Sequence, residues 1–180
     1  MMLLVLVFEP LLASSYSDRH KETVIFYVDG GPFFPLGSSA DRYKVGAHGG
    51  GGISFVVARS ESVSGDVGVR FDFYHFRYKD SRDCRYGTLG TFCVRRENFS
   101  ALSVEGRLIV TTRRWLRPYF TAGVGVFDLQ VFDMHQMTMA GVGADIAIDK
   151  SGTRPFYVEV RIVDTFVKFI RVDVGIRLTN

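Results

Sequence analysis

Strict alternation of apolar and polar residues runs through most of this 180-residue chain and limits what it can fold into. The clearest case is the final stretch, VKFIRVDVGIRLTN, where every second residue from Ile170 to Leu178 is apolar. The residues between them include Arg171, Asp173 and Arg177. A period of two places these two sets on opposite faces of a β-strand. Helical periodicity is nearly absent, so the chain is predicted to be all-β.

Eight segments show this pattern, some more clearly than others. The connections after even-numbered segments are compact turns, whereas the first and third segments are followed by long loops at 32–42 and 79–97. Alternating connection types are typical of an up-and-down antiparallel sheet, and eight such strands can close into a barrel that has no free edge. The predicted segments are residues 23–31, 43–58, 66–78, 98–111, 118–131, 136–148, 155–163 and 167–179.

Composition and length indicate one packed domain, predicted to span residues 23–180, because 47% of the residues are hydrophobic. Residues 1–22 are interpreted as an atypical signal peptide or an N-terminal arm. They contain an apolar run and then small residues, but Glu9 and Pro10 interrupt the pattern. The net charge of +3 comes without a long basic run, so nucleic acid is not predicted as a partner.

The two cysteines, Cys84 and Cys93, fall in the long polar loop at 79–97. Two cysteines in one loop, after an export-like start, predict a disulfide bond, although two free thiols remain an alternative. The four histidines are scattered, and none has zinc-ligand spacing with the cysteines. We therefore expect no metal ion and no cofactor.

The alternation alone leaves open which face of the sheet points into the barrel. A soluble lipocalin-like carrier has apolar residues inside, and an outer-membrane barrel has them outside. Long segments and a polar face that mixes charges with glycine and serine favour the outer-membrane arrangement. Aromatic residues near segment ends are expected to form a girdle at one membrane interface. These residues are Trp115, Tyr119, Phe120, Phe156 and Tyr157.

Two stretches resemble a known family. RPYFTAGVGVF at 117–127 and the ending VDVGIRL are similar to strands of the OmpA/OmpX-like group of small outer-membrane β-barrels, over about residues 23–180. The resemblance implies an eight-stranded antiparallel up-and-down transmembrane β-barrel in a bacterial outer membrane. It further implies outer-membrane lipid and the barrel-assembly machinery as partners of a monomer.

Charged residues on the polar faces are expected to meet in the barrel lumen. They balance, with five of each sign, and a narrow eight-stranded lumen requires buried charges to pair. A salt-bridge network is therefore predicted. If the last hairpin turns symmetrically about Thr165, Glu159 lies opposite Arg171 and like charges stay apart. The predicted network consists of Arg70, Asp72, Glu105, Arg107, Asp145, Glu159, Arg161, Arg171, Asp173 and Arg177.

These features favour a structural or adhesive barrel with a largely plugged lumen and the loops at 32–42 and 79–97 outside. A narrow porin-like channel, a soluble lipocalin-like carrier and a rim-located lipid A hydrolase are the alternatives. His75 and His135 could lie near the rim, but neither has a serine two or three positions away on the same strand face. We therefore predict no catalytic residues and no enzymatic activity.

Overall fold

The computed structural model describes residues 24–60, 62–79, 84–87, 90–93, 96–110, 115–128, 134–147 and 155–179. For 84–87, 90–93, 96 and 179 the description covers the backbone alone. The predicted signal peptide or arm at 1–22 lies outside these residues.

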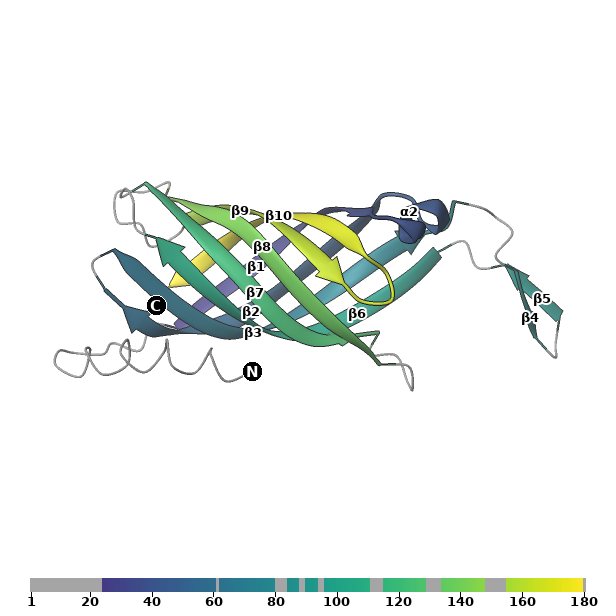
Figure 1. Cartoon of the computed structure of the whole chain (residues 1–180), viewed down its shortest axis with the longest axis horizontal. Coiled ribbons are helices and arrows are strands. Elements are labelled where there is room, and N and C mark those ends of the chain that lie inside the picture. The colour runs from purple at the N-terminus through teal and green to yellow at the C-terminus, as the bar shows by residue number, and fades with distance from the viewer. Residues whose placement is uncertain are drawn as a thin grey trace.

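Eight antiparallel strands close into a barrel, which confirms the predicted fold class (Figure 1). The order around the barrel is β1-β10-β9-β8-β7-β6-β3-β2, so strands next to each other in the sequence are neighbours. The one skip, from β3 to β6, passes over a separate hairpin of β4 and β5. The strands are β1 (Val24–Pro35), β2 (Gly46–Arg59), β3 (Val63–Arg77), β4 (Cys84–Gly87), β5 (Gly90–Cys93), β6 (Arg96–Val110), β7 (Leu116–Phe127), β8 (His135–Ala147), β9 (Pro155–Asp164) and β10 (Phe169–Thr179).

The first and last strands seal the barrel. They pair from Ile25 opposite Thr179 to Pro35 opposite Phe169. β1 therefore continues four residues past the predicted end at residue 31, into the predicted loop at 32–42. The extension places Phe33 inside the barrel, where it is fully buried.

The sequence pattern missed two short elements, both at the barrel end where β1 stops and β2 starts; this end is called the loop end below. A five-residue helix, α2 (Ser38–Arg42), lies there (Figure 1). It follows Gly37, whose positive φ of 57° suits glycine. One helical turn is too short to show periodicity, and the hairpin of β4 and β5 offers only four residues a strand. Among the described residues, no helix is long and apolar enough to cross a membrane.

The apolar face of every barrel strand points outward. Phe73 is 61% exposed and Val174 is 52% exposed, although both lie in the middle of regular strands. The same holds for Phe26, Ile53, Leu102, Val104, Phe120, Val142, Val158, Val160 and Ile176. Such an exterior suits lipid and would be costly in water. This orientation excludes the lipocalin-like carrier.

The aromatic residues expected at a membrane interface divide between the two faces. Phe120 and Phe156 are exposed on the outside, and Trp115, which immediately precedes β7, is exposed as well. Tyr119 and Tyr157 point into the lumen instead and are 3% and 1% exposed. Their places in the alternation, one residue away from Phe120 and Phe156, decide this.

An aromatic cluster fills the lumen at the loop end. The ring of Phe33 lies 4.4 Å from that of Phe76 and 5.2 Å from that of Phe169, measured between centroids. The cluster was not predicted, because the expected lumen contents were charges alone. Its buried members are Phe33, Tyr43, Tyr74, Phe76, Phe99, Ala101, Phe127, Met137, Met139, Val163, Val167 and Phe169.

Substitutions at two adjacent glycines of β2, Gly49 and Gly50, can show how tightly the lumen is packed. A Cβ added at Gly50 would overlap the carboxylate of Asp72 and lie 2.6 Å from the carbonyl oxygen of Phe71. A Cβ added at Gly49 would meet nothing closer than the carbonyl oxygen of Asp29, at 3.7 Å. We predict that Gly50→Ala destabilises the barrel by about 1–3 kcal/mol, as overpacking does, while Gly49→Ala is nearly neutral. Urea unfolding of both variants in lipid vesicles measures this, and equal stabilities would contradict the packing described.

Candidate functional site

The structure buries all ten side chains of the predicted charge network, and they come from five strands that line one lumen. It adds two carboxylates, Asp29 and Asp66, and one imidazole, His48, all buried. Among the buried side chains that the structure describes, seven carboxylates thus face five guanidinium groups. The arrangement is the main candidate for a functional site, because buried charges are costly and persist only with partners.

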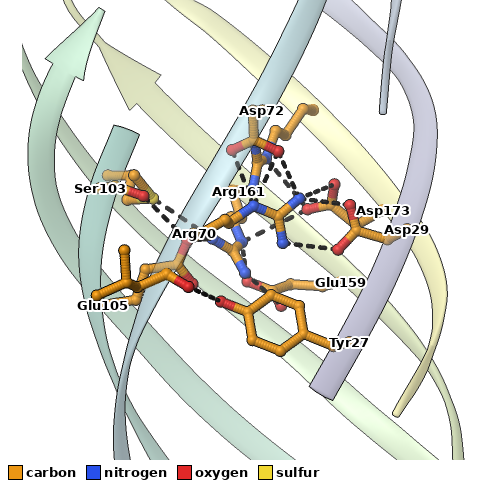
Figure 2. A network of polar contacts seen from close by, with 12 residues as sticks. Tyr27, Asp29, Arg70, Asp72, Ser103, Glu105, Glu159, Arg161 and Asp173 are labelled. Carbon is orange, nitrogen blue, oxygen red and sulfur yellow. Dashed lines mark hydrogen bonds and ion pairs between the residues drawn. The ribbon is translucent and has the colours of Figure 1, made fainter. Parts of the chain in front are cut away.

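Arg70 of β3 is the centre of the network (Figure 2). Its Nη1 donates to Asp29 Oδ2 at 2.6 Å, and its Nη2 contacts the other oxygen of that carboxylate. Its Nε donates to Asp72 Oδ2 at 2.8 Å and lies 3.6 Å from Glu105. One planar guanidinium therefore holds two carboxylates in the fork geometry that favours arginine over lysine.

Arg161 of β9 bridges the lumen toward β6. Its Nη1 donates to Glu105 Oε1 at 2.6 Å, and its Nη2 donates to Glu159 Oε2 at 3.0 Å. Its Nε lies 3.4 Å from Asp173. β9 and β6 are separated by two strands in the barrel, so this contact crosses the lumen (Figure 2).

Arg171 of β10 makes a second cross-lumen tie. It donates to Asp72 of β3 at 3.0 Å and lies 3.1 Å from Asp173 on its own strand. It also donates to the hydroxyl of Tyr74, which joins the charged layer to the aromatic cluster above it.

The predicted pairing of Glu159 with Arg171 is wrong. In the structure Arg171 lies opposite Arg161, and Glu159 lies opposite Asp173. The hairpin register is shifted by two residues, because the connection between β9 and β10 is longer than a turn centred on Thr165 would be. Like charges face each other across the strand pair, yet each finds its partner along its own strand or across the lumen. The cross-strand rule considers only the two facing residues of a strand pair. In a narrow barrel the opposite wall is close enough to supply the counter-charge.

A second cluster lies nearer the opposite end of the barrel, which is called the turn end. Arg107 donates to Asp66 at 2.8 Å and to the hydroxyl of Ser54 at 2.8 Å. Arg177 contacts the carboxylate of Asp145.

Two tyrosine rings pack against Arg177 inside the lumen. The guanidinium carbon of Arg177 lies 4.1 Å from the ring centroid of Tyr157 and 4.5 Å from that of Tyr119. Both distances are typical of cation–π contacts. The hydroxyl of Tyr119 donates to Glu159 at 2.8 Å, which links the turn-end cluster to the central network.

Sequence reasoning missed Asp29 and Asp66. Asp29 was identifiable, since Tyr27 and Asp29 alternate with outward Phe26 and Val28. The glycines that follow obscured this pattern. Asp66 was identifiable too, because it begins the predicted third segment four residues before Arg70, on the same face of the strand.

Three donor groups, on Asp29, His48 and Asp72, lie within 4.8 Å of one another, a spacing that could hold a metal ion. Arg70 already binds both of these carboxylates and supplies the positive charge that an ion would bring. His48 Nε2 lies 3.2 Å from Asp173. The geometry is that of an ion-pair network.

The two histidines weighed as rim catalysts have other neighbours. His75 Nδ1 lies 2.7 Å from the side-chain oxygen of Asn98. The ring of His135 packs on Phe166, at 4.5 Å between centroids. Neither is hydrogen-bonded to a serine among the residues that the structure describes.

No family model and no curated protein sequence matches this chain. Solved structures do match it. Neisserial surface protein A is 12% identical, with a TM-score of 0.54 over 86% of this chain and 96% of that one. A de novo designed transmembrane β-barrel is 17% identical, with a TM-score of 0.52 over 91% and 100%. The Yersinia pestis outer membrane protein Ail, solved in a phospholipid bilayer nanodisc, is 11% identical, with a TM-score of 0.51 over 87% and 99%.

The chain has the fold of the small outer-membrane β-barrels. The inside-out polarity of its wall agrees with this, since lipid requires an apolar exterior and tolerates a polar lumen. The barrel is therefore a membrane-spanning one of the outer-membrane type.

The buried pair of Asp66 and Arg107 allows the coupling energy between two members of the network to be measured. Asp66→Asn alone leaves a buried guanidinium without its carboxylate and should cost about 3–5 kcal/mol of unfolding free energy. Adding Arg107→Met should recover part of that loss, so that the double-mutant cycle shows strong coupling. The exposed pair of Asp164 and Lys168, 3.2 Å apart, is the matched control. Its coupling should stay below about 1 kcal/mol. Additive losses at the buried pair would show that its members do not depend on each other.

Proposed function

We propose that this chain works in a bacterial outer membrane as a non-enzymatic, surface-exposed structural or adhesive barrel whose lumen does not conduct. The observation that supports this proposal is the burial of the inward side chains along the described strands. Arg70, Phe76 and Phe127 are each 0% exposed, although they lie on the inner wall. A water-filled channel would leave such side chains exposed, and eight strands enclose only enough space for side chains.

The proposed partners follow from the outer surface. Outer-membrane lipid would cover the apolar wall, and the barrel-assembly machinery would act during biogenesis. A monomer is sufficient, since the closed barrel leaves no strand edge to pair with a second copy.

Conductance in planar bilayers tests the sealed lumen. Folded protein, identified by heat-modifiable gel mobility, is expected to be silent. Phe76→Ala combined with Phe127→Ala is expected to be silent as well, because the ion pairs around Arg70 close the lumen independently of the aromatic cluster. Phe73→Ala, on the outer wall, is the control. Discrete conductance steps from the unmodified protein would favour the narrow porin-like channel instead.

The hairpin of β4 and β5 is proposed to be displayed outside the cell and closed by a disulfide bond. Cys84 lies opposite Cys93 in the backbone register. Directly opposite residues of an antiparallel pair have Cα atoms about 4.5–5.5 Å apart, within the range that disulfides span. Long loops of such barrels lie on the extracellular side.

Labelling of intact cells tests both parts of that proposal. A membrane-impermeant maleimide should not label the protein before reduction. After treatment with an impermeant reductant, it should label both Cys84 and Cys93. Labelling without reduction would reject the disulfide bond. No labelling of intact cells, combined with labelling of broken ones, would reject external display.

A further inference from the structure

Beyond the last paired residues of β2 and β3, the two chains pair once more, at Tyr43 and Tyr78. The two rings lie 4.9 Å apart and pack with the aromatic cluster, so they point inward. Burial and hydrogen bonds with Glu97 and Tyr43 raise the pKa of the Tyr78 phenol, which keeps it neutral. The residues on either side of this inward pair are exposed; one of them, Arg42, is the last residue of α2, and another, Lys79, follows the end of β3.

Basic residues occupy all four of these flanking positions: Arg42, Lys44, Arg77 and Lys79, each of them exposed. The amide of Lys44 donates to the carbonyl of Arg77 at 2.8 Å, and the amide of Lys79 donates to the carbonyl of Arg42 at 2.8 Å. Lys44 is therefore opposite Arg77, and Arg42 is opposite Lys79, with Cα atoms about 5.5 Å apart. Two like-charged pairs lie side by side.

This arrangement costs the fold stability, because like charges directly opposite each other destabilise an antiparallel pair. In the part of the chain that the structure describes, none of the four forms an ion pair with a carboxylate. The neutral tyrosines between them bring no counter-charge, and the nearby carboxylate of Glu97 is hydrogen-bonded to Tyr78. An anion from outside the protein would remove the repulsion.

The position of the four cations indicates which anion is at hand. On β3 they continue the outward row of Phe71 and Phe73, the second of which is 61% exposed to the surroundings of the barrel. Arg77 follows Phe73 by four residues, or about 13 Å along the strand. Strands of such barrels tilt by about 35–45°, so the rise along the membrane normal is smaller. The cations thus lie just past the apolar band, at the level of lipid headgroups.

We propose that Arg42, Lys44, Arg77 and Lys79 bind the phosphate groups of a phosphorylated lipid in the outer leaflet. The inference rests on the proposed placement of the loop end outside the cell. Arginine can grip a phosphate with two parallel hydrogen bonds, and lysine adds a mobile point charge. Two adjacent pairs of cations match a lipid that carries more than one phosphate.

The test uses the full chain folded into phosphatidylcholine vesicles, alone or with a minor fraction of diphosphorylated lipid A. Vesicles with dephosphorylated lipid A are the lipid control. The site variant is Lys44→Gln with Arg77→Gln. The protein control is Arg59→Gln with Lys168→Gln, which removes the same formal charge from two other exposed positions, one of them paired with Asp164. Gel mobility reports insertion, and the urea midpoint reports binding.

The expected result is a crossover. In phosphatidylcholine alone the site variant should be at least as stable as the unmodified protein, because a like-charged pair is gone. Diphosphorylated lipid A should raise the midpoint of the unmodified protein and of the control variant, and the dephosphorylated lipid should not. The site variant should bind about tenfold to thirtyfold more weakly, since each cation at an anionic lipid surface contributes about 1 kcal/mol. Added salt should narrow the difference.

Other outcomes contradict the site. If the site variant and the unmodified protein gain equal stability from diphosphorylated lipid A, the four cations do not bind its phosphates. If dephosphorylated lipid gives the same gain, the effect comes from the acyl chains. Failure of the unmodified protein to insert into any of the vesicles would instead overturn the membrane barrel itself, and this site with it.

Discussion

The need to neutralise charge inside a narrow tube is the constraint on which this structure depends. The outside of the wall is apolar, so the charged residues of each strand have the lumen to occupy. Eight strands leave little room there for water. Each guanidinium must therefore meet carboxylates from the wall, and Arg70, Arg161 and Arg171 do so with partners on other strands. The charges that alternation places inside thereby tie together strands that do not pair.

Much of this could be predicted from the sequence, because a period of two is a simple code. The alternation indicated the strands and assigned Arg70, Asp72 and Arg177 to one face. Register could not be predicted in the same way. The shift that puts Arg171 opposite Arg161 depends on the length of one connection and on contacts from three strands away. Cross-strand rules contain neither kind of information.

The aromatic cluster shows a different limit. Phe33, Phe76, Phe127 and Phe169 lie on the same faces as the charged residues, only nearer the loop end. In a one-dimensional pattern, an apolar residue on a polar face looks like a break in the strand. In the folded barrel these apolar residues come together at the loop end and form the aromatic cluster. Residues far apart in the sequence had to be placed together before this core became visible.

The side chains that fill the lumen belong mainly to the barrel wall, and this limits how the protein could become permeable. A plug made from a loop or a separate domain can swing aside, so its channel can be regulated. In the described part of the chain, nearly all of the buried lumen side chains belong to barrel strands, and the two exceptions in the aromatic cluster, Tyr43 and Val167, lie within three residues of a strand. With the sealed lumen proposed above, permeability would have to be acquired by substitution. Each substitution that widened the lumen would also remove a contact between distant strands. A more permeable barrel would therefore be a less stable one.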